Sequence, residues 1–205
     1  MTLRDGTKVV VRMLRPEDKE LLREGFNRLS PESRYARFLV PKAALTDAEL
    51  RYLTEIDQVD HVAIGAADEH DVGVGIARFI RLADHPTTAE AAITVADAYQ
   101  RKGLGTLLLS RLCDAARERG VERFRCEVLG SNKSMQALIE HLAPDRTIEV
   151  GGGVMTIEMV LPDVTPTHPP DTVAPEGALY RLLRAAAQNT VEFTDAVRRL
   201  WHRND

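Results

Sequence analysis

The spacing of apolar residues along the chain alternates between helical and strand-like, and these changes mark out the elements of residues 1–161. Short or alternating apolar runs bounded by turn residues predict strands, and apolar residues three or four apart after Ser, Thr, Asp or Pro predict helices. The predicted strands are 7–14, 61–67, 72–82, 91–95, 123–129, 147–150 and 154–161, and the predicted helices are 15–29, 31–39, 46–56, 103–119 and 132–142. The order predicts an α/β fold, with a mixed central sheet and helices on both of its faces.

The stretch from residue 90 to residue 120 organises the rest, because it joins a strand to a helix through a glycine turn. The turn reads Gln100-Arg101-Lys102-Gly103-Leu104-Gly105. The glycines allow a tight turn and leave no side chain over it, so that backbone N–H groups can converge on an anion at the start of the helix. The helix dipole and the two flanking cations favour the same ligand, a pyrophosphate. The turn matches neither the nucleotide P-loop nor the dinucleotide GxGxxG pattern.

A strand followed by Gln-x-x-Gly-x-Gly and a long helix resembles the acetyl-coenzyme A loop of the GNAT acyltransferases, and the element order from about residue 3 to 161 resembles the GNAT fold. The resemblance implies acetyl-CoA as cosubstrate. It implies a bulged anchor strand that splays from strand 123–129 to hold pantetheine, and no metal. The coenzyme-binding residues implied are Ile93, Thr94, Val95, Gln100, Arg101, Lys102, Gly103, Leu104, Gly105, Asn132 and Ser134. Asn132 is equally a plain helix N-cap.

Transfer of an acyl group to an amine calls for a base, because a lysine amine with a pKa of about 10.4 is charged at neutral pH. Glu90, ten residues before Gln100, lies at the substrate end of the anchor strand, and the resemblance implies a glutamate base in this region. The alternative is that Glu90 is a solvated carboxylate beside the polar run 85–88. Asp57, Asp60 and His61 are weaker candidates for the base, since they also read as a turn or cap.

The leaving thiolate receives a proton from a tyrosine in many GNAT enzymes, and Ile139 stands at roughly that position here. Ser134 or water would then protonate the sulfur, or the thiolate would leave unaided.

Segments 29–39, 57–64 and 90–100 resemble the catalytic domain of Pat-type bacterial protein lysine acetyltransferases. This resemblance implies a protein lysine as acceptor and supports Glu90 as base, while regulation by cAMP is not carried over. A small-molecule amine is the alternative acceptor. A non-catalytic acyl-CoA-binding or interaction module is the alternative from another class.

Composition excludes several other classes. The formal net charge of −4 offers no basic field for nucleic acid. No apolar stretch approaches 18 residues and residues 1–10 lack a signal-peptide core, so we expect no membrane association and a cytoplasmic location. Cys113 and Cys126 read as small buried hydrophobes.

The last part of the sequence changes character. Pro162–Gly177 holds five prolines and predicts an extended linker after a domain of residues 1–161. Residues 178–205 predict an amphipathic helix. That helix would dock on its own domain or form a homodimer, and the sequence favours neither.

Overall fold

A computed structural model of the chain describes residues 1–162. These residues form a seven-stranded sheet in the order β1-β2-β3-β4-β5-β7-β6. The strands are β1 (Val9–Met13), β2 (His61–Asp68), β3 (Gly73–Leu82), β4 (His85–Val95), β5 (Arg123–Leu129), β6 (Arg146–Gly151) and β7 (Val154–Val160). The helices are η1 (Pro16–Asp18), α1 (Lys19–Asn27), α2 (Pro31–Phe38), α3 (Asp47–Thr54), η2 (Asp97–Tyr99), α4 (Leu104–Glu118) and α5 (Lys133–Leu142).

The predicted α/β architecture and order of elements are confirmed. All neighbouring strands are antiparallel except β4 and β5, which run parallel. A parallel pair needs a long crossover, and α4 supplies it. The connection places the start of α4 directly after the end of β4.

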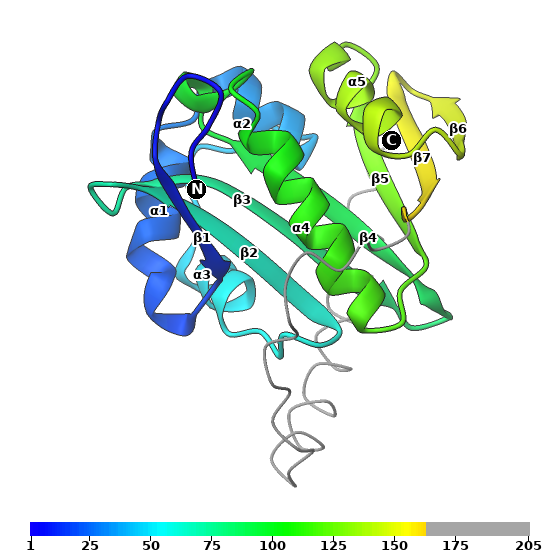
Figure 1. The fold of residues 1–205 in the computed structure, drawn as a ribbon, viewed down its shortest axis with the longest axis horizontal. Coiled ribbons are helices and arrows are strands. Elements are labelled where there is room, and N and C mark those ends of the chain that lie inside the picture. The colour runs from blue at the N-terminus through cyan, green and yellow to red at the C-terminus, as the bar shows by residue number, and fades with distance from the viewer. Residues whose placement is uncertain (163–205) are drawn as a thin grey trace, which may run out of the picture. The chain divides into compact units, whose positions relative to one another are not determined.

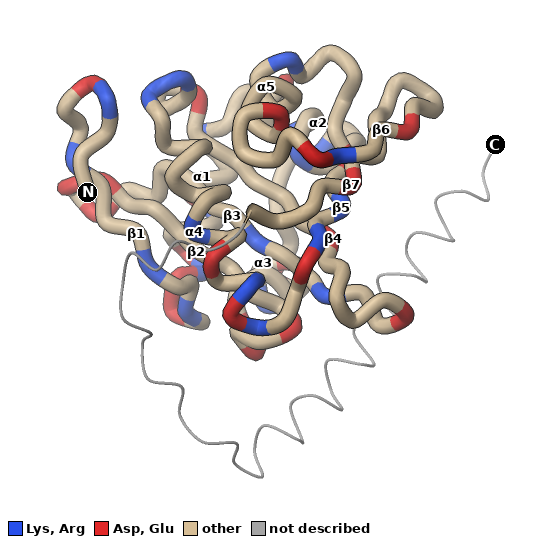
Figure 2. Tube along the Cα trace, turned by 45° about the vertical axis from the view of Figure 1, so that its right-hand side comes forward, with Lys and Arg blue, Asp and Glu red and all other residues tan. Residues whose placement is uncertain are grey.

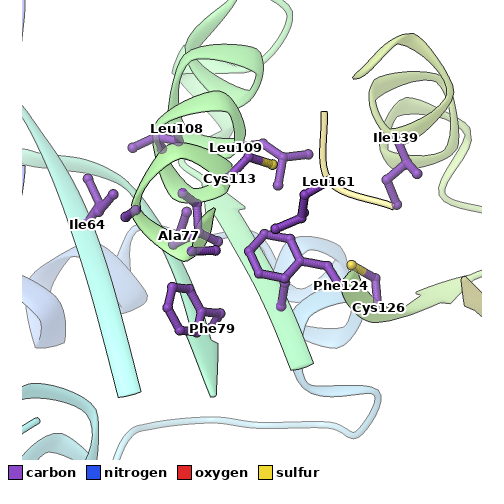
Figure 3. Packing of buried hydrophobic residues seen from close by; sticks show 14 of the residues in the cluster. Ile64, Ala77, Phe79, Leu108, Leu109, Cys113, Phe124, Cys126, Ile139 and Leu161 are labelled. Carbon is purple, nitrogen blue, oxygen red and sulfur yellow. The ribbon is translucent and has the colours of Figure 1, made fainter. Parts of the chain in front are cut away.

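The two faces of the sheet carry different helices (Figure 1). Helix α4 packs against β2, β3 and β4 on one face, and the helices from α1 to α3 cover the opposite face, where α1 meets β3 and α2 meets β4. The core lies under α4, where Leu108, Leu109 and Cys113 pack with Ala77 and Phe79 (Figure 3).

Strand β5 shows the predicted alternation, because Phe124, Cys126 and Val128 share the buried face. Burial raises the pKa of Cys126 to about 12, so this thiol stays protonated, as expected of a buried hydrophobe.

Side chains cap the starts of two helices that the sequence predicts after Ser or Thr. The Ser30 hydroxyl accepts a hydrogen bond from the Ser33 N–H at 3.1 Å at the start of α2, and Thr46 and Glu49 form a capping box at the start of α3. The prediction for β4 was too short, since the strand begins at His85 rather than Ala91. The hydrogen bonds between strands join backbone groups, so the polar segment 85–88 can belong to β4 although it has no apolar pattern.

The predicted linker and C-terminal helix fall, from residue 163 onwards, outside the described residues. Their docking therefore stays a prediction.

Candidate active site

The most distinctive feature of the sheet is the separation of its two parallel strands. β4 and β5 pair only at Thr88–Arg123, Ala89–Phe124 and Glu90–Arg125. Beyond Glu90 the register contains no further β4–β5 pair, although both strands continue to Val95 and Leu129. The predicted splay is confirmed.

The anchor strand differs from the expectation in one respect. Its register against β3 runs without a shift from Ala89 to Val95, so the expected bulge is absent from this part of β4. Strand β5 keeps its other partner, since it pairs with β7 along its whole length, from Arg123–Val160 to Leu129–Val154.

A groove of about 960 Å³ occupies the space between the diverging strands. Predicted coenzyme-binding residues make up much of its lining: Ile93, Thr94, Val95, Gln100, Arg101, Gly103, Gly105, Asn132 and Ser134. Leu129 of β5 and Leu138 of α5 line it as well. The structure thus brings residues from positions 93 to 134 to one surface.

The start of α4 at this groove has the backbone expected of an anion site. Gly103, the N-cap, has φ +91°, a left-handed conformation that glycine adopts without steric cost. Gly105 lies so close to α5 that a Cβ atom there would be 3.4 Å from Leu138 Cδ2. The first N–H groups of a helix have no partner within it, so they remain available to a phosphate.

Two predicted coenzyme residues direct their side chains elsewhere. Lys102 forms an ion pair with Asp5 at 2.9 Å and lies over the ring of Tyr99. Leu104 is fully buried in the core. Only the backbone groups of these two residues remain for the coenzyme.

Asp97 joins the loop before α4 to helix α2. It accepts hydrogen bonds from the backbone N–H of Ser30 at 2.9 Å and from the hydroxyl of Ser33 at 2.6 Å. Burial acts to raise the pKa of Asp97, but the hydrogen bonds from these serines outweigh it, and the pKa lies below its usual value. The Gln100 amide donates to the Val95 carbonyl at 3.1 Å, which closes the loop onto β4.

Arg4 is a groove residue that the sequence analysis missed. Its backbone N–H donates to the Lys102 carbonyl at 3.1 Å, and its Nε would lie 3.4 Å from a Cβ atom on Gly103. It lines the groove together with Arg101 and adds a cation at the start of α4. No local pattern could have found it, because about a hundred residues separate Arg4 from the loop.

Glu90 lies on β4 at the last pair before the strands separate. Its neighbours Ala89 and Ala91 are buried in the core, so the Glu90 side chain points to the opposite face of the strand, away from α4. Figure 2 shows that acidic and basic residues follow one another where β4, β5 and β7 lie side by side. On β5 and β7, Arg125 and Glu158 form an ion pair at 3.3 Å.

The weaker candidates for the base all have structural roles. One carboxylate oxygen of Asp57 accepts backbone N–H groups of the following turn, including that of His61 at 2.8 Å. Asp60 pairs with Arg81 at 2.7 Å. Burial, with a contribution from the charge of Arg78, lowers the pKa of His61 to about 3, and so weak a base cannot take a proton from an ammonium group.

Helix α5 presents polar groups to the groove but no tyrosine. Ile139 is fully buried in the core, on the side away from solvent. The Asn132 side chain accepts a hydrogen bond from the Met135 N–H at 3.1 Å, so it caps α5 and lines the groove as well. Ser134 is exposed in the groove.

The described residues hold neither a metal cluster nor a membrane span. Within residues 1–162, no three His, Cys, Asp or Glu side chains gather where they could ligate an ion. No helix in this part of the chain has the length and apolar character needed to cross a bilayer.

Comparison with known proteins assigns the chain to one family. Residues 22–143 match the pattern described as the acetyltransferase (GNAT) family. The chain is 34% identical over 189 residues to "Acetyltransferase Pat" of Mycolicibacterium smegmatis, an alignment that covers 91% of this chain and 56% of that relative. It is 36% identical over 140 residues to "Acetyltransferase PA5475" of Pseudomonas aeruginosa, covering 67% of this chain and 75% of that protein.

Solved structures agree with these relatives. The crystal structure of the GNAT domain of S. lividans PAT superposes with a TM-score of 0.72 at 31% identity, over 78% of this chain and 95% of that one. The structure of yncA from Salmonella typhimurium with acetyl-CoA superposes with a TM-score of 0.61 at 22% identity, over 83% and 99% of the two chains, which shows the shared fold. The chain spans only about half the length of the M. smegmatis relative.

Proposed function

The chain belongs to the GNAT acetyltransferase family, and from this premise we propose that it transfers an acetyl group directly from acetyl-CoA to an amine, with Glu90 as general base. The separation of β4 from β5 immediately after Glu90 carries the proposal. A groove lies beyond that point, and Glu90 belongs to the last β4–β5 pair before it, with its side chain on the face of β4 away from α4.

The groove suits the successive parts of the coenzyme. The N-terminus of α4, with Arg4 and Arg101 beside it, would bind the pyrophosphate. The free backbone edge of β4 from Ile93 to Val95 has lost its partner strand, so its N–H and C=O groups would pair with the amides of pantetheine. The thioester then lies toward Glu90.

The chemistry proposed needs few groups. Glu90 takes a proton from the acceptor ammonium, directly or through water, and the amine attacks the thioester carbonyl. The C–N bond forms, the C–S bond breaks, and coenzyme A leaves as a thiolate. A thiol with a pKa of about 8.5 is a fair leaving group. As the amide forms, the attacking nitrogen loses its second proton, which passes to the thiolate through the exposed hydroxyl of Ser134 or through water, because Ile139 supplies none.

Replacement of the proposed base is the first test. Glu90→Gln keeps the size of the side chain and should lower kcat by roughly a hundredfold or more, the typical contribution of general base catalysis, with acetyl-CoA affinity nearly unchanged. Glu127→Gln is the matched control, since Glu127 is a carboxylate on the neighbouring strand. An unchanged kcat in the Glu90 variant, or a larger loss in the Glu127 variant, would remove Glu90 from this role.

We propose a protein lysine as acceptor, because segments 29–39, 57–64 and 90–100 resemble the Pat-type lysine acetyltransferases, and two relatives that match at more than 30% identity carry the name Pat. Isotopically labelled acetyl-CoA would be incubated with the purified protein and a bacterial lysate, with Glu90→Gln as control. Label on a few protein lysines that requires Glu90 is the expected result. Label confined to small amines would change the acceptor class, and saturable acetyl-CoA binding with no label would favour the alternative of a binding module.

A further inference from the structure

A second cavity lies on the other side of β4 from the α4 core. This inner cavity has a volume of about 360 Å³ and lies between the sheet and the helices α1, α2 and α3. Most of its lining is aliphatic or aromatic, with Leu22, Phe26 and Phe38 among the contributors from the helices. A volume above about 300 Å³ is within the range of small-molecule sites.

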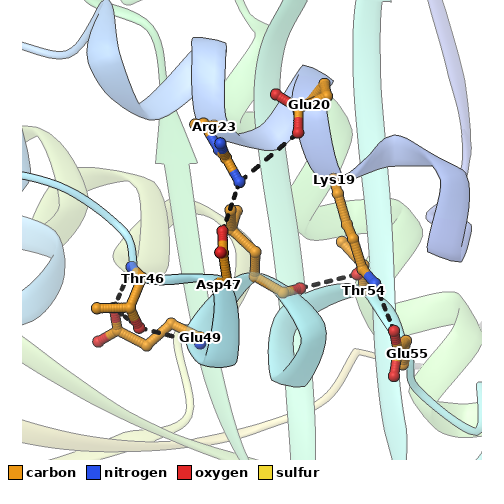
Figure 4. A network of polar contacts seen from close by, with 9 residues as sticks. Lys19, Glu20, Arg23, Thr46, Asp47, Glu49, Thr54 and Glu55 are labelled. Atoms are coloured by element: carbon orange, nitrogen blue, oxygen red, sulfur yellow. Dashed lines mark hydrogen bonds and ion pairs between the residues drawn. The ribbon is translucent and has the colours of Figure 1, made fainter.

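Ion pairs hold the helical cover of the inner cavity together (Figure 4). Arg23 of α1 pairs with Asp47 of α3 at 2.7 Å, and Lys19 of α1 bonds Glu55 directly after α3. These ion pairs link α1 to the two ends of α3 on the helical side of the cavity.

The charged residues in the lining are not balanced. Arg12 is matched by Asp18, with two hydrogen bonds of 2.7 Å, and Asp71 lies near Arg12. The remaining charged lining residues, Arg37 and Arg78, are both cations. Within residues 1–162, neither guanidinium has a carboxylate at ion-pair distance.

Arg78 is the more deeply buried of the two, with 5% of its surface exposed. It donates to His61 Nε2 at 3.0 Å and to the Leu53 carbonyl at 3.0 Å, which uses two of its five N–H donors. Burial, together with the nearby charge of Arg37, lowers the pKa of Arg78 to about 9. The neutral His61 and a carbonyl cannot compensate this charge as a carboxylate would.

Arg37 has fewer polar partners than Arg78. Among the described residues it forms no hydrogen bond or ion pair, and its guanidinium lies over the Phe38 ring at 5.0 Å. Burial lowers its pKa as well. Arg78 is buried and Arg37 is half-buried near it, and two neighbouring cations are costly unless an anion shares them. A planar guanidinium favours a carboxylate.

The inner cavity meets the coenzyme groove at two residues, because Arg37 and Thr94 line both. Thr94 lies in the segment of β4 that would bind pantetheine, directly before the thioester, and on the same face of the strand as Glu90. An acyl group longer than acetyl would therefore extend from the groove toward Arg37.

We propose that the inner cavity is a carboxylate subsite of the enzyme, in which Arg37 and Arg78 bind a carboxylate at the end of a short aliphatic chain. The position beside Thr94 favours the acyl donor as its source, a coenzyme A thioester of a dicarboxylic acid. The acceptor amine attacks the thioester carbon, the C–S bond breaks, coenzyme A leaves with the proton, and the distal carboxylate is unchanged. The inference rests on the proposed function for the location of the thioester.

Binding of two donors of equal chain length tests the subsite without turnover. Succinyl-CoA and butyryl-CoA would be titrated calorimetrically into the full chain, with no acceptor present. Charge-assisted hydrogen bonds are about twice as strong as neutral ones, so succinyl-CoA should bind at least about tenfold more tightly. Arg37→Gln and Arg78→Gln should each remove most of this ratio, and Arg37→Lys should restore part of it.

Arg51→Gln provides the matched control. Arg51 is an exposed arginine on α3 that lines neither cavity, so its variant should keep the succinyl-to-butyryl ratio and the rate of acetyl transfer. Because Arg78 is buried, the Arg78 variant is first checked for folding by circular dichroism. If it fails to fold, the Arg37→Gln variant still tests the subsite, because Arg37 is only half-buried.

A second arm distinguishes the other source of a carboxylate. With acetyl-CoA as donor, kcat/KM would be compared for an α-amino acid and its amide. A preference for the amino acid that Arg37→Gln removes would support the subsite and assign it to the acceptor.

Equal binding of the two donors together with equal rates for the two amines would overturn the proposal. So would a preference that survives both arginine variants. The donor titration measures binding and needs no catalysis, so the two hypotheses can fail separately. Acetyl transfer that depends on Glu90, with no preference for a carboxylate, would contradict the subsite and leave the proposed function intact. A preference for succinyl-CoA in a protein that transfers no acyl group would support the subsite and contradict the proposed function.

Discussion

Three glycines allow the anion-binding loop to be tested with one chemical change, the addition of a methyl group. Gly103 has φ +91° and Gly120, at the other end of α4, has φ +75°, whereas Gly105 lies in the first turn of the helix with helical backbone. Alanine in a left-handed conformation costs roughly 1–2 kcal/mol. Alanine in place of glycine within a helix instead stabilises by about 0.5–1 kcal/mol.

The expected signs are therefore opposite at positions two residues apart. Gly103→Ala should lower the melting temperature by several degrees, since about 2–4 °C corresponds to 1 kcal/mol for a domain of this size. Gly105→Ala should raise it by up to about 4 °C, because the new Cβ would lie 3.4 Å from the flexible end of Leu138, an ordinary contact. The melting temperature is measured by circular dichroism without ligand.

Gly120→Ala separates backbone strain from coenzyme binding. A Cβ there meets nothing within 4 Å, so this variant has the strain of Gly103→Ala without any change in the groove. Saturating acetyl-CoA at 100 times its Kd should stabilise the Gly120 variant by about 2.7 kcal/mol, as it does the parent protein. The Gly103 variant should lose much of this gain, because its Cβ lies 3.4 Å from Arg4 Nε at the start of α4. Equal coenzyme stabilisation in both variants, or a lower melting temperature for Gly105→Ala, would refute the reasoning.

Two further predictions concern the framework. Gly75→Ala would bring a Cβ to 2.8 Å from Leu108 Cδ1, so overpacking should lower the free energy of unfolding in urea by about 1–3 kcal/mol, and a neutral result would contradict the packing of α4 on β3. Arg12→Met should cost about 1–3 kcal/mol at pH 7, because it leaves the Asp18 carboxylate, 7% exposed, without its partner. The hydrogen bond from Arg12 holds the pKa of Asp18 below its usual value, so the stability that this pair contributes is present above the unfolded pKa of about 3.9 and is lost as the pH falls through the folded pKa. Urea unfolding at pH 7 and at pH 3 should therefore give a smaller difference between variant and parent at the lower pH, and a constant difference would argue against the ion pair.

The features that the sequence predicts well are those that depend on neighbouring residues. Ser30 and Thr46 start helices because a side-chain oxygen reaches an N–H three residues ahead, and Gly103 allows a left-handed turn wherever the chain leads afterwards. The spacing of apolar residues in α4 predicts which side of the helix is buried. These signals are contained in windows of a few residues, so they survive without knowledge of the fold.

The features that the sequence does not predict depend on distant contacts. Arg78 reads as one polar position in a strand, and only the packing of α3 and His61 around it makes it a buried cation. Arg4 reaches the coenzyme groove because the N-terminal segment crosses the loop at Lys102. The length of β4 was missed for a related reason, since its polar first residues are held by the backbones of β3 and β5.

The arrangement of β4 explains how one strand can serve binding, chemistry and selectivity together. Its odd-numbered residues Ala89 and Ala91 face the α4 core, and this fixes the strand firmly in the sheet. Its even-numbered residues Glu90 and Thr94 therefore face the other side, toward the charged surface and the inner cavity. Loss of the β5 partner beyond Glu90 frees the backbone between them. On the proposed function, a strand in this position would bind the coenzyme with its edge while its side chains meet the acceptor, and the two substrates would approach from opposite faces of the sheet.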